Sequence, residues 1–192
     1  IDYKKEDERI TLDVGAVILS PGFEPFDPRL KGELGYGRYP NVLTSLEFER
    51  ILSASGPFSG KVQRPADRKV PERIAFIQCV GSRDHERDYC SSVCCMYATK
   101  EAIIAKEHAG ESLQCDIFFM DIRAFSKGFE AYFESAKKLG VNYIRCRVPS
   151  IEEIPETGNL KIHYLTGDDR KTSGEYALLV LSVGLPPPNN VD

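Results

Sequence analysis

The sequence predicts an α/β fold, a Rossmann-like parallel sheet with a short antiparallel excursion. From residue 71 onward, short apolar runs alternate with amphipathic helical segments in the order β-α-β-α-β. Strands that are buried on both faces of a parallel sheet read as such continuous apolar runs. Consecutive parallel strands need a crossover helix, and these crossovers are right-handed.

The first strand of this series is expected at residues 74–80. A helix should follow, capped by Ser91 or Ser92, because serine is a preferred N-cap residue. It should run to about His108 and stop at Gly110, since glycine readily takes the left-handed conformation that ends helices.

Two further strands are expected at residues 116–122 and 142–148, with a second helix between them. Ser126 is the expected cap of this helix and Gly140 its end. Its apolar side chains recur at helical spacing, which predicts one buried face made of Phe129, Tyr132, Phe133, Ala136 and Leu139.

The rest of this half predicts an antiparallel excursion and one more buried strand. Residues 150–154 and 160–165 read as strands, and the Gly-Asp-Asp sequence at 167–169 reads as a turn. Residues 176–183 then return as an apolar strand that Gly184 closes.

The region before residue 71 is less regular. A strand is expected at residues 14–19, stopped by the Pro-Gly pair that follows it. A helix capped by Ser45 is expected at residues 45–53, and residues 56–71 read as an exposed connector.

Composition excludes several classes of function. The 192 residues carry a net charge of −4 and no basic block, so there is no electrostatic reason to expect nucleic acid binding. No apolar stretch approaches the roughly 18 to 20 residues that span a bilayer, so direct membrane insertion is not expected. Irregularly spaced cysteines without a secretory signal favour a cytoplasmic location. The chain begins at Ile1 rather than Met, and we expect it to be a piece of a longer protein.

The cysteines carry the strongest chemical signal. Four of the six, Cys79, Cys90, Cys94 and Cys95, lie within one short segment. We expect Cys79 at the end of a strand, Cys90 in a loop, and Cys94 and Cys95 in the first turn of a helix, where free N–H groups and the helix dipole favour anions.

The spacing favours an iron–sulfur cluster and leaves alternatives open. It matches neither the ferredoxin runs nor the paired Cys-x2-Cys of zinc ribbons. Zinc, with His85 replacing one thiolate, is one alternative, and buried structural cysteines or a redox-active pair are others. Cys115 and Cys146 fall in strand patterns and are expected in the core.

The turn after the first strand of the series lacks a dinucleotide fingerprint. Of the three glycines in Gly-x-Gly-x-x-Gly only Gly81 is present, so nicotinamide binding is disfavoured. Asp121 ends the next strand, where an acidic ribose-binding residue is expected, although an exposed aspartate at a strand end is common.

Two blocks around the cysteines strongly resemble the A-subunit family of heterodisulfide reductase. They are residues 76–84 (FIQCVGSRD) and 89–102 (YCSSVCCMYATKEA). Shorter matches at residues 121–125, 155–160 and 180–184 extend the resemblance over nearly the whole chain. Members of this family are flavin and iron–sulfur electron-transfer proteins with a thioredoxin-reductase-like core.

The resemblance implies that the four clustered cysteines ligate a [4Fe–4S] cluster. It also implies that residues 71–192 form a Rossmann-like domain that carries them. Residues 1–70 would then hold a strand, a helix and a connector from the junction with a flavin domain.

Residues 17–22 and 181–184 resemble the two crossings between the flavin and nucleotide-like domains of this architecture. Pro21, Gly22 and Gly184 are therefore expected near the FAD of the full-length protein. An FAD fingerprint is absent here, so the chain alone is expected neither to hold FAD nor to be catalytically active.

The function expected from the resemblance is that of an electron-transfer module. It would relay electrons through the cluster, between a flavin and the other components of a redox complex. The alternatives are a degenerate nucleotide-binding or zinc-holding docking domain, and an NAD(P)H-binding domain that donates hydride to FAD.

Overall fold

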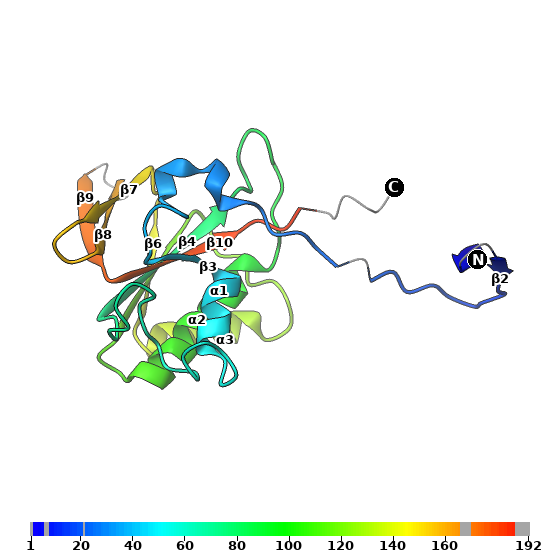
Figure 1. The fold of residues 1–192 in the computed structure, drawn as a ribbon, viewed down its shortest axis with the longest axis horizontal. Coiled ribbons are helices and arrows are strands. Elements are labelled where there is room, and N and C mark those ends of the chain that lie inside the picture. Colours follow the sequence, from blue (N-terminus) through cyan, green and yellow to red (C-terminus); the bar gives the residue numbers. More distant parts are fainter. Residues whose placement is uncertain (1, 6–7, 21, 166–169, 187–192) are drawn as a thin grey trace.

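A five-stranded, all-parallel sheet forms the centre of the computed structural model, which describes residues 2–5, 8–20, 22–165 and 170–186 (Figure 1). The strand order is β3-β10-β4-β5-β6. The bounds of these strands are Val42–Thr44, Leu178–Val183, Arg73–Val80, Gln114–Phe119 and Val141–Arg145. The predicted α/β class with a Rossmann-like parallel sheet is confirmed, while β3 was not predicted.

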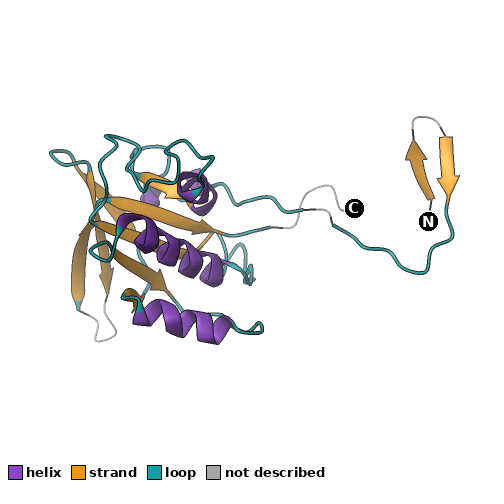
Figure 2. Cartoon of the chain, turned by 90° about the horizontal axis from the view of Figure 1, so that it is seen from below, coloured by secondary structure: helices purple, strands orange, loops and turns teal. Residues whose placement is uncertain are grey.

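Helices cover one face of this sheet (Figure 2). They are α1 (Ser45–Leu52), α2 (Cys94–Ala109) and α3 (Phe129–Lys138). Strand alternation directs Ile74 and Phe76 toward this layer, where they pack with Phe48 and Ala98. Strand β3 belongs to the parallel sheet and α1 belongs to the helical layer. The Rossmann-like sheet and its helices therefore include residues before residue 71.

A small antiparallel sheet covers the other face. Its strands, in order, are β7 (Ser150–Ile154), β8 (Asn159–Leu165) and β9 (Lys171–Tyr176). Ala75 and Ile77 of β4 pack here against Leu160, Ile162 and Tyr176. The two predicted strands of the antiparallel excursion are confirmed, and β9 adds a strand that was not predicted. The turn predicted at residues 167–169 lies outside the described residues.

The helix ends differ in part from the predictions. Thr44, not Ser45, caps α1, in a capping box with Glu47. Neither Ser91 nor Ser126 caps a helix, since α2 and α3 begin after Val93 and Gly128 without a side-chain cap. The hydroxyl of Ser91 instead accepts a hydrogen bond from the Leu185 amide at 2.9 Å.

The prediction of a strand at residues 14–19 is wrong. The described part of this segment has no strand partner and is solvent-exposed, with Ile18 at 90%. It extends away from the body and ends in a hairpin of β1 (Asp2–Lys5) and β2 (Glu8–Thr11) (Figure 1). An apolar run alone does not form a strand without a neighbouring strand to pair with.

The segment that enters the body from this arm contains two 3-10 turns, Pro28–Leu30 and Gly32–Leu34. The loop at residues 56–71 was predicted to be an exposed connector. It is a loop, but Val62 and Arg64 within it are buried. No helix in the described ranges is long and apolar enough to cross a membrane.

The amino-terminal edge of the parallel sheet is held by a buried polar network. Asp116 accepts hydrogen bonds from Arg73 and Tyr176, both at 2.7 Å, and from Asn142 at 2.9 Å. The Arg73 guanidinium also lies over the Tyr176 ring. Four strands are thereby joined at this edge, while the carboxyl edge is left for other chemistry.

At the carboxyl edge, the turn after β4 packs closely against the entering segment. Gly81 has a φ of 74°, and a Cβ placed there would lie 2.1 Å from the Phe26 ring. Phe26 donates its backbone N–H to Gly184 (2.8 Å), and Gly184 donates to Val80 (2.7 Å). The turn therefore needs glycine for both conformation and space.

We expect Gly81→Ala to lower the free energy of unfolding by about 2 kcal/mol or more, because it adds left-handed strain to a steric clash. Gly32→Ala is the control, since a Cβ there meets nothing within 4 Å. Urea denaturation should leave this control within about 0.5 kcal/mol of wild type. Equal losses for both variants would contradict the close packing of Gly81.

Candidate metal centre

Four cysteines converge at the carboxyl edge of the parallel sheet. Cys79 lies near the end of β4, Cys90 lies in the loop that follows, and Cys94 and Cys95 open α2. These are the positions predicted from the sequence. Cys94 and Cys95 are buried, and the other two are partly exposed.

Backbone conformation turns Cys79 toward the other thiols. Regular strand alternation would place residue 79 on the face opposite to the helices. Its φ of 62° is left-handed, which is uncommon for a residue other than glycine. Such local strain is typical of functional sites.

The sulfurs lie close enough to influence one another. Burial raises the pKa of Cys79 to about 11, and the Cys95 thiol is the next largest cause of this rise. Burial likewise raises the pKa of Cys94 and of Cys95, and Cys90 adds to both shifts. Thiolates in this set are therefore favoured only when a cation binds them.

Hydrogen bonds anchor three of the sulfurs. Cys94 donates to the Val183 carbonyl at 3.7 Å and Cys95 to the Asp121 carbonyl at 3.8 Å. The Cys90 sulfur accepts the Ser92 N–H at 3.3 Å. The segments at the ends of β10 and β5 thus hold the α2 cysteines, and a backbone amide supports Cys90.

Four cysteine sulfurs are donors that suit either a zinc ion or an iron–sulfur cluster. A tetrahedral zinc with Zn–S bonds of about 2.3 Å places its sulfurs roughly 3.8 Å apart. Among the side chains that the structure describes, no three of His, Cys, Asp or Glu are arranged to hold one ion. Iron–sulfur clusters are likewise held by four cysteine thiolates.

Asp121 does not offer a free carboxylate to a ribose. Arg83 contacts both of its oxygens, and Arg123 lies within 3.5 Å of each. Despite the effect of burial, these arginines lower the pKa of Asp121. The residue positioned for ribose binding is used to order the loop around the cysteines.

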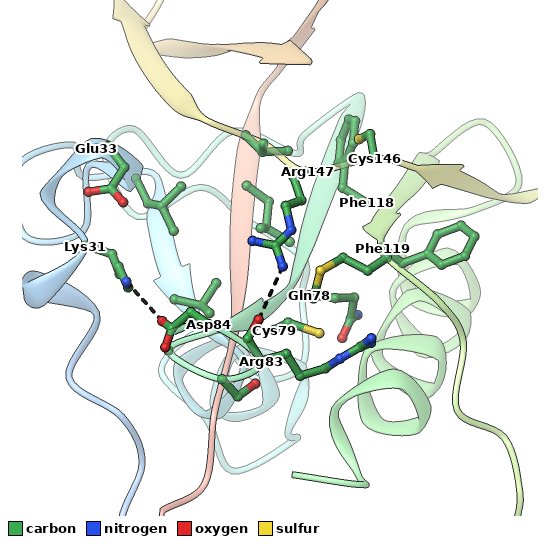
Figure 3. A pocket seen from close by; sticks show the side chains of 17 residues that line it. Lys31, Glu33, Gln78, Cys79, Arg83, Asp84, Phe118, Phe119, Cys146 and Arg147 are labelled. Carbon is green, nitrogen blue, oxygen red and sulfur yellow. Dashed lines mark hydrogen bonds and ion pairs between the residues drawn. The ribbon is translucent and has the colours of Figure 1, made fainter. Parts of the chain in front are cut away.

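A cavity of about 150 Å³ opens beside Cys79 (Figure 3). Its walls include Phe118, Cys146 and Arg147, and Arg147 donates to the Arg83 carbonyl at 3.2 Å. Of the two remaining cysteines, Cys115 is a core residue, as predicted, whereas Cys146 is only half-buried.

Of the residues expected near FAD, Gly184 lies beside the thiols, because Cys94 donates to the carbonyl of Val183, the residue before it. Gly184 follows β10, packed against the turn at Gly81. Gly22 has a φ of 78° and no atom of the described chain within reach of an added Cβ. Pro21 lies outside the described residues. The segments that carry them leave the body on the same side (Figure 1).

Two polar residues near the centre were not singled out from the sequence. Gln78 interrupts the apolar run of β4, and this interruption was the available signal. Glu101 is buried in α2. The sequence alone could not distinguish it from other glutamates, because most glutamates in helices are exposed. Of three basic residues near the cysteines in the sequence, Arg83 faces the site, Arg87 stacks on Phe26 at 4.8 Å, and Lys100 pairs with the surface Glu49 at 2.9 Å.

Comparison with curated proteins gives matches over the full length of this chain. The chain is 50% identical to the CoB–CoM heterodisulfide reductase iron-sulfur A-subunit 2 of Methanopyrus kandleri, over 100% of this chain and 30% of that protein. It is 45% identical to the iron-sulfur A-subunit of Methanocaldococcus jannaschii, over 99% of this chain and 30% of that protein. It is 42% identical to the H2:CoB-CoM heterodisulfide, ferredoxin reductase A-subunit of Methanothermobacter marburgensis, over 100% of this chain and 29% of that protein.

Over its whole length the chain is similar to one part of heterodisulfide reductase A-subunits. It spans about 30% of the length of these relatives. No protein-family model matches it. Among solved structures, LpdA of Mycobacterium tuberculosis aligns with 72% of this chain and 27% of its own, at 10% identity and a TM-score of 0.40.

Glu101 makes the stability of this chain depend on pH. Burial, with the nearby Glu49 carboxylate, raises the pKa of Glu101 from 4.5 to about 9, against the opposing effects of Lys100 and Ser45. The folded chain therefore keeps a proton that the unfolded chain releases above about pH 4.5. This contribution to stability is complete below that pH and is lost as the pH rises through about 9.

We expect Glu101→Gln to remove this dependence. The difference in unfolding free energy between wild type and variant should change by up to about 1.4 kcal/mol per pH unit between pH 5 and 9, in favour of the variant at high pH. Glu107→Gln, at an exposed site on the same helix, is the control and should follow wild type. Parallel wild-type and Glu101→Gln curves would show that Glu101 is ionised in the folded state.

Proposed function

We propose that the chain is an electron-transfer module of a heterodisulfide-reductase-like flavin and iron–sulfur complex. Cys79, Cys90, Cys94 and Cys95 would ligate one [4Fe–4S] cluster, which takes up and releases single electrons. The observation that carries this proposal is the meeting of four thiols from a strand end, a loop and a helix start, in mutual electrostatic contact.

The start of α2 suits an anionic group. Its N-cap residue, Val93, makes no side-chain hydrogen bond, so the first N–H groups of the helix have no such cap. These groups and the helix dipole favour the negative charge of thiolates and sulfides. A dinucleotide fold uses the same physics to hold a pyrophosphate at the same place.

Arginines add positive charge beside the thiols. The Arg83 guanidinium lowers the pKa of Cys79 against the larger effect of burial. Arg83 is itself held by Asp121, and its backbone carbonyl by Arg147. The loop from residue 81 to residue 89 would thereby act as a charged cover over the ligands.

In the longer protein, we propose that the segments before Phe26 and after Gly184 connect this unit to a flavin domain. The hydrogen bond between these two residues places the segments side by side where they leave the body. Pro21, Gly22 and Gly184 would then lie near the FAD. The relatives are named as subunits, which supports partner subunits for this chain in a cytoplasmic redox complex.

Anaerobically purified protein is expected to contain about four irons and four sulfides, the content of one cubane. It should show a broad visible absorbance that bleaches with dithionite. Cys95→Ser should lose most of this iron because it removes one ligand. Cys146→Ser is the matched control, a half-buried cysteine outside the ligand set, and should keep the full content.

Each alternative has its own outcome in this experiment. A colourless wild-type protein with one equivalent of zinc would overturn the cluster and favour a docking domain. Saturable NADH binding that is lost in Asp121→Asn would instead favour a hydride-donating domain. Full iron retention in Cys95→Ser would remove Cys95 from the ligand set.

A further inference from the structure

Gln78 is a buried amide without a partner. It is the polar residue in β4, its side chain is only 7% exposed, and neither Oε1 nor Nε2 has a hydrogen-bond partner among the described residues. A buried polar group in this condition destabilises the folded state, because it has lost its hydrogen bonds to water. Native structures rarely keep such a group unless something outside the chain satisfies it.

The position of Gln78 indicates what that partner is. Strand alternation places residue 78 on the same face as Ile74 and Phe76, which pack against the helical layer. The start of α2, with Cys94 and Cys95, lies over this end of the strand. Gln78 also precedes Cys79 directly, and Figure 3 shows the two side chains beside Arg83.

Most of the neighbouring polar groups are already used, although the buried Ser182 hydroxyl on the adjacent strand β10 also lacks a partner among the described residues. Arg83 is engaged by Asp121, and the thiols of Cys94 and Cys95 donate to backbone carbonyls. Thiolate and sulfide sulfurs accept hydrogen bonds, and an amide Nε2 is a donor. A metal centre on the four thiols would supply the acceptor that the amide lacks.

We propose that the carboxamide of Gln78 donates a hydrogen bond to the metal centre and thereby sets its reduction potential. This inference rests on the proposed function. Reduction adds one electron from an external one-electron donor to the centre, without a bond to the protein being made or broken. The added negative charge strengthens the hydrogen bond, so Gln78 favours the reduced form and raises the potential.

The test uses two variants that remove the donor while keeping the length of the side chain. Gln78→Met is apolar, and Gln78→Glu adds a carboxylate in the same shape. Gln114→Met is the control, because Gln114 is exposed on the neighbouring strand β5. Iron content, EPR-monitored redox titration and thermal unfolding of the iron-free protein are measured for each.

We expect Gln78→Met to keep its iron. Its metal centre should be reduced about tenfold less favourably, which is a fall in reduction potential of ~59 mV for a one-electron couple. The potential of Gln78→Glu should fall further, because this variant adds negative charge. The iron-free Gln78→Met protein should unfold at a higher temperature than wild type, since it no longer buries an unpaired amide. A residue with a purely structural role would not move the two measurements in opposite directions.

The outcomes separate this inference from the proposal beneath it. Iron-loaded variants with the wild-type potential and EPR spectrum would overturn the role of Gln78 and leave the cluster in place. A wild-type protein without iron would overturn the cluster and the role of Gln78 together. A potential that falls equally in the Gln114→Met control would also overturn it, since the effect would not be local.

Discussion

The burial of β4 and β10 on both faces is the constraint on which the rest of this structure depends. Both strands are almost wholly apolar, so each must be covered by a layer on either side. Helices provide one layer and the antiparallel sheet provides the other. Little of either strand can then carry chemistry, and polar groups are confined to the two edges of the sheet.

The two edges have taken opposite roles. At the amino edge, Asp116 is fully paired with Arg73, Tyr176 and Asn142, and it joins strands through these bonds. At the carboxyl edge several local rules are broken together. Cys79 has a left-handed backbone, α2 starts without a side-chain cap, and Gln78 lacks a partner among the described residues. Violations that gather in one place, within an otherwise well-satisfied fold, are typical of a functional site.

This edge is where dinucleotide-binding folds hold a nucleotide, and the residues here do not suit one. Only one glycine of the phosphate cradle is present, and the carboxylate suited to a ribose is paired with arginines. The helix dipole is kept, because it favours any anion. In the proposed function, thiols at the strand end and in the first helical turn would take over a site whose electrostatics already suits an anion.

The parallel sheet, its three helices and the antiparallel excursion were predictable from the sequence, because apolar periodicity reports which faces an element must bury. The clustering of the four cysteines was predictable for the same reason, since the carboxyl end of a strand and the start of its crossover helix are neighbours in space. The exposed arm, β3, the caps and the roles of Gln78 and Glu101 were not. They depend on which parts of the chain lie near one another in space. Ser45, for example, donates its hydroxyl to the carbonyl of the distant Leu181, and Thr44 caps α1 instead. Only the packed structure brings such partners together.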